Sequence, residues 1–186
     1  MIIPVYAYGS PVLRRIAEDI TSDYPDLEQL IENMFETMAH ANGVGLAAPQ
    51  VGKSIRLFLV DARIYGDEYE SLKDFKRVFI NAYIVEEWGE EVIETEGCLS
   101  IPNIHEDVYR YNNIKMKYVD ENFEEKEEVF EGMAARIIQH EYDHLDGILF
   151  PDKLSQLKKR LLKGKLKDIS IGRVNVEYKM VFPVKK

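Results

Sequence analysis

The chain has 186 residues, of which 46% are hydrophobic, and a formal net charge of −9 at pH 7. This size and composition suit one domain with a sizeable core, which we expect to span residues 1–186. The acidic balance argues against a protein that binds DNA by neutralising phosphates over its whole surface. The sequence has no apolar run of the ~18 residues that a membrane helix needs. Its first residues lack a basic start and a long apolar segment, so we expect no secretory signal there. A single cysteine, Cys98, excludes an internal disulfide, so we expect a cytoplasmic protein.

Helical signals open the chain. The Ser-Pro pair at its start predicts a short helix at residues 10–17. A longer helix is expected at about 25–41, because leucine, isoleucine and methionine recur there on one helical stripe. Ser22 or Asp23 is the expected N-cap, and Gly43 the expected end.

Short runs rich in β-branched and aromatic residues predict strands, which we expect at 56–60, 78–80, 88–95, 109–118 and 127–130. The polar segment 63–76 predicts an exposed, mobile loop. Apolar residues alternate at period two over 174–182, which indicates a half-buried strand at the C-terminal end. These elements predict an α+β fold in which antiparallel β-sheets pack around a central metal-binding helix, followed by a C-terminal helix and strand.

That central helix carries the motif His140-Glu141-Tyr142-Asp143-His144. Residues four apart lie on one face of a helix, so the two histidines can grip one metal ion together. Met133 and Ile137 precede them on the same stripe, which directs the imidazoles inward. Glu141 is placed to act as the general base of metal-assisted hydrolysis. Gly147 is the expected C-terminal cap.

A third ligand is needed, because catalytic zinc-type sites usually have three protein ligands and leave one position for water. The residues themselves leave several candidates open: Cys98, His40, His105 and many carboxylates. Cys98 follows a glycine at the end of a predicted strand, where backbone can approach closely. The other two histidines have no supporting pattern and are expected to be structural or surface residues.

The segment 43–52 is rich in glycine and small residues, so a substrate backbone can lie against it. It lacks the lysine and the spacing of a phosphate-binding loop, which argues against nucleotide binding. Within it, the amide of Gln50 can donate a hydrogen bond to a developing oxyanion.

Three segments together, 43–50, 96–100 and 139–144, resemble in order and spacing the signature motifs of peptide deformylases. The residues after Ile80-Asn81 and Ile101-Pro102, which are Ala82 and Asn103, depart from the residues often found in that family. The resemblance implies an enzyme that removes the N-formyl group from the formyl-methionine of newly made polypeptides and releases formate.

The same resemblance assigns the metal ligands to Cys98, His140 and His144. It implies one divalent ion, Fe²⁺ in cells, with Zn²⁺, Ni²⁺ or Co²⁺ as substitutes. Glu141 would move the proton, while Gln50 and the backbone N–H of Leu99 would hold the oxyanion.

Methionine specificity requires an apolar pocket beside the metal, and the candidates for its lining are Val44, Met133 and Ile137. Gly45 and Gly97 would offer backbone groups to the substrate chain, in the manner of an added strand.

Around the ligands, Asp143 and Glu96 are expected to orient the site, with Arg110 as a cationic partner for one of them. The sequence does not decide which of the two carboxylates Arg110 binds.

Two other functions remain open at this stage. The histidine motif alone is shared with general metalloproteases, whose third ligand usually lies downstream of the pair. The basic, leucine-containing segment 153–167 predicts an amphipathic helix that ends near Gly164. The basic face of this helix is expected either to be solvated or to contact an anionic partner such as RNA. In the second case the chain would be a ribosome-binding module. In deformylases the C-terminal helix contacts the ribosome, so this function and the enzymatic one can coexist.

Overall fold

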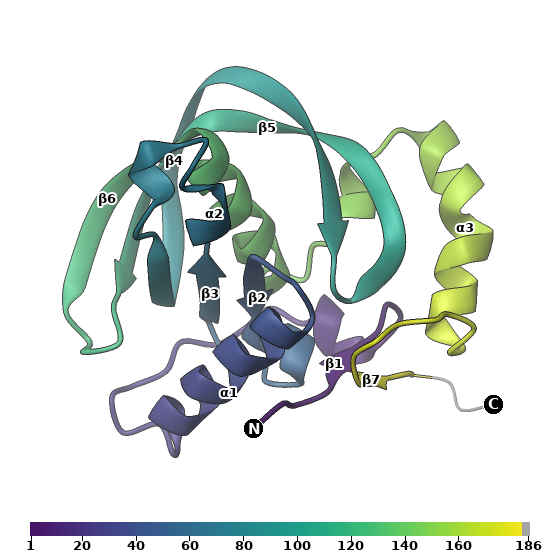
Figure 1. Cartoon of the computed structure of the whole chain (residues 1–186), viewed down its shortest axis with the longest axis horizontal. Coiled ribbons are helices and arrows are strands. Elements are labelled where there is room, and N and C mark those ends of the chain that lie inside the picture. The colour runs from purple at the N-terminus through teal and green to yellow at the C-terminus, as the bar shows by residue number, and fades with distance from the viewer. Residues whose placement is uncertain (184–186) are drawn as a thin grey trace.

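The computed structural model describes residues 1–183, in which three helices and seven strands form an α+β fold, as predicted (Figure 1). The helices are α1 (Leu27–His40), α2 (Gly132–Leu145) and α3 (Gln156–Ser170). The strands are β1 (Val5–Tyr6), β2 (Gly45–Ala47), β3 (Leu57–Asp61), β4 (Lys76–Cys98), β5 (Ile101–Val119), β6 (Glu125–Glu131) and β7 (Met180–Val181). None of the helices within 1–183 has the length and apolarity that crossing a membrane requires.

Five strands form one antiparallel sheet in the order β2-β3-β4-β5-β6, whereas β1 and β7 form a separate parallel pair. Helix α2 packs against this sheet, and its buried face shares a core with Phe58, Phe79 and Phe130. The central position predicted for the histidine-bearing helix is therefore confirmed. Helix α3 lies at one edge of the molecule (Figure 1) and buries Leu162 and Leu166 against a second core cluster.

Strands β4 and β5 form a long curved ribbon that arches over α2 (Figure 1). The two separate strands predicted at 78–80 and 88–95 are one strand, interrupted by register shifts rather than by a turn. Asn81 (φ 50°) and Gly89 (φ 88°) have positive φ beside such shifts, which marks local bulges that bend the ribbon. Residues 83–95 of this strand are exposed or half-buried, so the middle of the strand is polar and lacks the apolar pattern by which a continuous strand could be predicted.

Several predicted boundaries are wrong. The first helix is a short 3₁₀ turn at Pro11–Arg14, and α1 starts after Asp26, whose side chain makes no capping bond. Helix α3 runs through Gly164 and ends at Ser170, since a helix interior tolerates one glycine at a cost of about 1 kcal/mol.

The segment 63–76 is less exposed than predicted, because Leu72 and Phe75 are buried beside the sheet. The predicted C-terminal strand pairs only at Met180–Val181. Its burial nevertheless alternates over residues 173–180, as the period-two pattern indicated.

Candidate active site

The two histidines of α2 lie one turn apart on its inner face, with ring centroids separated by 5.3 Å. Gly147, at φ +71°, follows the helix at the expected capping position, and the N–H of Ile148 donates to the carbonyl of Asp143 at 2.9 Å. This capped end holds His144 rigidly in the last helical turn.

The third potential metal ligand, Cys98, comes from the β4–β5 ribbon. Cys98 is the last residue of β4, and its Sγ lies 3.4 Å from Nε2 of His144. One ligand atom each from Cys98, His140 and His144 lies within 4.8 Å of the other two. His40 and His105 are exposed at the cavity rim, so they do not join this cluster.

The cluster fits one divalent metal ion. A thiolate with two imidazoles is a donor set that suits zinc or ferrous iron. Burial lowers the pKa of His144 well below its ordinary value, whereas burial of His140 is outweighed by its interactions with Cys98 and Glu96, which raise its pKa. Nδ1 of His144 has no hydrogen-bond partner within residues 1–183.

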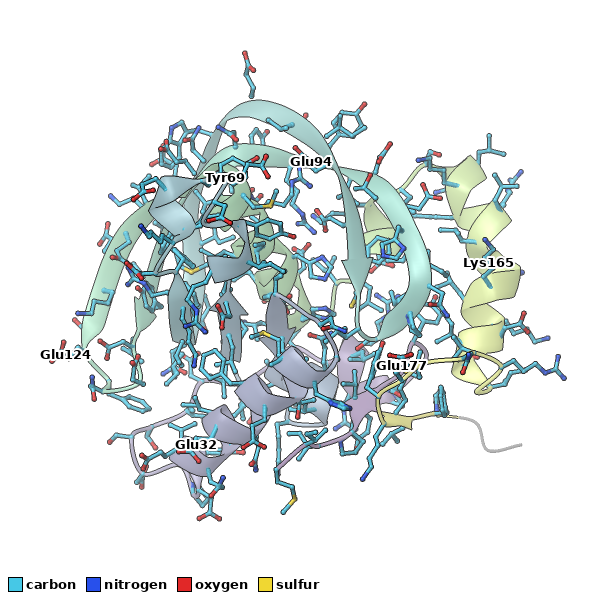
Figure 2. All side chains as sticks on the ribbon, viewed as in Figure 1. Glu32, Tyr69, Glu94, Glu124, Lys165 and Glu177 are labelled. Carbon is cyan, nitrogen blue, oxygen red and sulfur yellow. The ribbon has the colours of Figure 1, made fainter. Side chains whose placement is uncertain are left out.

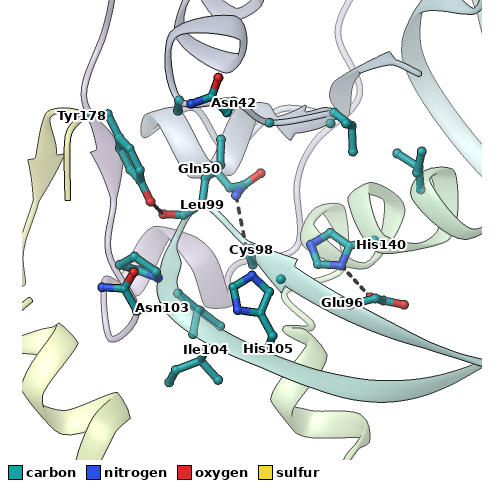
Figure 3. A pocket seen from close by; sticks show the side chains of 18 of the residues that line it. Asn42, Gln50, Glu96, Cys98, Leu99, Asn103, Ile104, His105, His140 and Tyr178 are labelled. Carbon is teal, nitrogen blue, oxygen red and sulfur yellow. Dashed lines mark hydrogen bonds and ion pairs between the residues drawn. The ribbon is translucent and has the colours of Figure 1, made fainter. Parts of the chain in front are cut away.

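Glu96 connects the site to the scaffold (Figure 3). Its carboxylate accepts from Nε and Nη2 of Arg110 at 2.6 and 2.8 Å, from Arg136 at 2.7 Å, and lies 2.7 Å from Nδ1 of His140. Burial alone would raise the pKa of Glu96, but the bonds from Arg110 and His140 outweigh it and lower that pKa well below its ordinary value. The ring of His140 is thereby fixed with Nε2 free to face Cys98.

Arg110 binds both of the carboxylates between which the sequence did not decide. Its Nη1 donates to Asp143 at 2.9 Å while its other nitrogens hold Glu96. Arg136, which no motif marked, also reaches Glu96 and donates to the Val92 carbonyl at 2.6 Å. The available signal was a single arginine within the apolar first half of this helix.

Glu141 points into the same space. Its Oε2 is buried without a hydrogen-bond partner in the described chain, and burial raises the pKa of its carboxyl to about 7. Gly45 on β2 passes so close that a Cβ there would lie 2.7 Å from Cδ of Glu141. Glycine is therefore required at this position for the carboxylate to occupy its place.

Gln50 is almost fully buried in the 3₁₀ turn Ala48–Val51. Its Oε1 accepts from the N–H of Ala47 at 2.9 Å, which fixes the orientation of the amide. Its Nε2 lies 3.4 Å from the sulfur of Cys98 (Figure 3). The same Nε2 lies 3.2 Å from Oγ of Ser100. A donor is thus held beside the metal cluster.

These groups open onto a cavity of about 720 Å³. It is lined by all the residues that the sequence suggested for substrate and chemistry, namely Val44, Gly45, Gln50, Gly97, Cys98, Leu99, Met133, Ile137, His140 and Glu141. His144 is buried and is not among the residues that line the cavity. The sequence did not indicate Tyr65 or the residues 175–178, which also line it.

Comparisons with known proteins agree with this geometry. The sequence profile of the polypeptide deformylase family matches residues 2–160. The chain belongs to this family. A peptide deformylase of Christiangramia forsetii is 56% identical over 98% of this chain and 97% of its own length. One of Flavobacterium johnsoniae is 53% identical over 100% and 98%. The crystal structure of the Thermus thermophilus enzyme superposes with a TM-score of 0.80 at 39% identity, covering 90% of this chain and 97% of that one.

Family membership defines the activity. The chain is a metal-dependent deformylase that removes the N-formyl group from newly made polypeptides, so formyl-methionine peptides are its substrates. A general metalloprotease and a purely non-enzymatic module are set aside by the same finding.

Proposed function

We propose that Cys98, His140 and His144 hold the metal ion and that Glu141, Gln50 and Leu99 carry out the deformylation around it. The observation that supports this assignment is that three ligand atoms cluster beside the cavity lined by Glu141, whose Oε2 has no hydrogen-bond partner within residues 1–183. An ion held there supplies Lewis acidity, which lowers the pKa of a coordinated water towards roughly 7 and polarises a carbonyl.

In this mechanism, water attacks the formyl carbon and gives up a proton to Glu141. The side-chain N–H of Gln50 and the backbone N–H of Leu99 stabilise the oxyanion that forms on the formyl oxygen. Glu141 then delivers the proton to the amine nitrogen as the C–N bond breaks, which yields formate and a free amino terminus.

The methionine side chain would occupy the apolar part of the cavity formed by Val44, Met133 and Ile137. The backbones of Gly45 and Gly97 border the same cavity and would pair with the extended substrate. Val44→Asp tests this assignment: the KM for formyl-Met-Ala-Ser should rise, and an unchanged KM would remove Val44 from the pocket.

The proposed ion in cells is Fe²⁺, with Zn²⁺, Ni²⁺ and Co²⁺ as working substitutes. The thiolate of Cys98 tolerates both ferrous iron and zinc, and beside Fe²⁺ it is open to oxidation. Metal analysis of protein purified without oxygen would identify the ion. Activity of the Fe²⁺ form should decay in air while the Ni²⁺ and Zn²⁺ forms persist, and equal decay in all forms would argue against the idea.

We assign residues 1–186 to one catalytic domain that acts in the cytoplasm.

We further propose that the basic segment 153–167 contacts the ribosome near newly made chains. Exposed side chains along α3, where Lys165 lies at the edge of the molecule (Figure 2), support this contact. Charge reversal at Lys163 and Lys165 should weaken co-sedimentation with ribosomes and leave tripeptide deformylation unchanged. Undiminished co-sedimentation would refute the contact.

The decisive experiment compares Glu141→Gln with the matched surface variant Glu125→Gln in a formate-release assay on formyl-Met-Ala-Ser. Loss of general acid–base catalysis should reduce kcat on the order of 10² to 10⁴-fold for Glu141→Gln. Glu125 is exposed on β6, so its variant should match the native rate. Metal content should survive in both. A Glu141→Gln enzyme that keeps more than about a tenth of the native kcat would contradict the proton-transfer role.

A further inference from the structure

The C-terminal segment 174–178 runs along the rim of the active-site cavity, although it lies beyond the region that the family profile matches. In Figure 1 the chain leaves α3 and passes between the tip of the β4–β5 ribbon and β1 before it reaches β7. Val174, Val176 and Tyr178 are half-buried, while Asn175 and Glu177 are exposed. Asn175 to Tyr178 line the cavity that also contains Cys98, His140 and Glu141.

Two hydrogen bonds fasten this segment to the turn between β4 and β5 and to the start of β5. The hydroxyl of Tyr178 donates to the carbonyl of Leu99 at 2.7 Å (Figure 3). The amide Nδ2 of Asn103 donates to the carbonyl of Asn175 at 3.1 Å. Burial raises the pKa of Tyr178, so the hydroxyl keeps the proton that it donates.

The two residues that bind this segment, Leu99 and Asn103, lie at the closed end of the β4–β5 ribbon. Leu99 follows the metal-binding cysteine in the tight turn between β4 and β5, with its side chain near Gly43. Asn103 has φ +62°, a left-handed conformation that asparagine tolerates and glycine adopts without strain. Glycine at this position would preserve the backbone but could not bind the segment.

We propose that segment 174–178 forms one wall of the substrate cleft and that Tyr178 is a positioning residue for the Leu99 turn. The inference rests on the proposed role of the Leu99 N–H. A hydrogen bond from outside to the Leu99 carbonyl restrains rotation in the turn, so the adjacent N–H is already aimed when the oxyanion develops. The wall faces the residues that follow formyl-methionine in the substrate, because it stands at the outer rim with Glu177 exposed (Figure 2).

Tyr178→Phe removes the donor and keeps the ring. It should lower kcat for formyl-Met-Ala-Ser about two- to tenfold, the range of one net hydrogen bond, while KM changes by less than about twofold. The matched control is Lys179→Ala, the next residue, which is exposed and does not line the cavity. Its kcat and KM should equal those of the native enzyme. An unchanged kcat in Tyr178→Phe, even with a lower melting temperature, would overturn the positioning role.

Asn103→Gly tests the wall separately. Loosening the segment should raise KM for formyl-Met-Ala-Ser by about two- to tenfold and leave KM for formyl-methionine amide, which has no following residue, unchanged. An equal effect on both substrates, or none on either, would overturn the wall. A Glu141→Gln variant in the same assay distinguishes failure of the proposed mechanism from failure of the role of segment 174–178. If this variant remains active, it is the proposed mechanism that fails.

Discussion

Replacing Arg110 by Met should destabilise the protein far more than the loss of a surface ion pair. Arg110 is only 4% exposed, and three of its N–H groups bind Glu96 and Asp143. Removing one partner from a buried ionic cluster costs about 3–5 kcal/mol, because the opposite charge stays buried and uncompensated. Glu96 keeps Arg136 and His140 as partners, so we expect the lower end, about 3 kcal/mol.

Urea unfolding at neutral pH, followed by circular dichroism, measures this loss. The matched control is Arg63→Met, which breaks an exposed pair with Asp61 and should cost less than about 1 kcal/mol. The variant at Arg110 should also bind metal about 10- to 100-fold more weakly, because His140 loses a rigidly held acceptor. A destabilisation of Arg110→Met no larger than that of the control would refute the reasoning.

Three further predictions concern other parts of the site and fold. The pKa of Glu96 is lower in the folded chain than its ordinary 4.5, so its stabilisation is present above that pH and is lost as the pH falls through the folded pKa. The difference in unfolding free energy between native protein and Glu96→Gln should therefore shrink from about pH 6 to about pH 3, and a constant difference would contradict this. Gly45→Ala should lower kcat at least about tenfold by displacing Glu141, and native kinetics would show that the carboxylate needs no such space. Gly164→Ala, with open space around it in α3, should raise the unfolding free energy by about 0.5–1 kcal/mol in urea titrations, whereas destabilisation would reveal a contact that the structure lacks.

The two histidines of the site could be placed from the sequence because helical periodicity determines which face of α2 they occupy. The spacing of His140 and His144 determines their shared face, and neighbouring apolar residues determine that this face is buried. Cys98 was one candidate among several until the resemblance to deformylases was considered. Its approach depends on the curvature of the β4–β5 ribbon, which brings together residues more than 40 positions apart in the chain. Short-range patterns contain no information on such a curve, since it arises from bulges along the ribbon.

In the C-terminal segment, the sequence pattern predicted burial correctly but did not predict strand pairing. Alternation at period two correctly predicted which side chains of residues 174–180 are half-buried, because an extended chain on an apolar surface turns alternate residues towards it. A strand also requires a neighbour with free backbone donors and acceptors, and only Met180–Val181 meets one, in β1. The remaining residues are held instead by two side-chain hydrogen bonds, one from Tyr178 within the segment and one from Asn103 near the start of β5. A segment fastened at two points can therefore shape the cleft without belonging to the sheet, and its influence on catalysis depends on those two side chains.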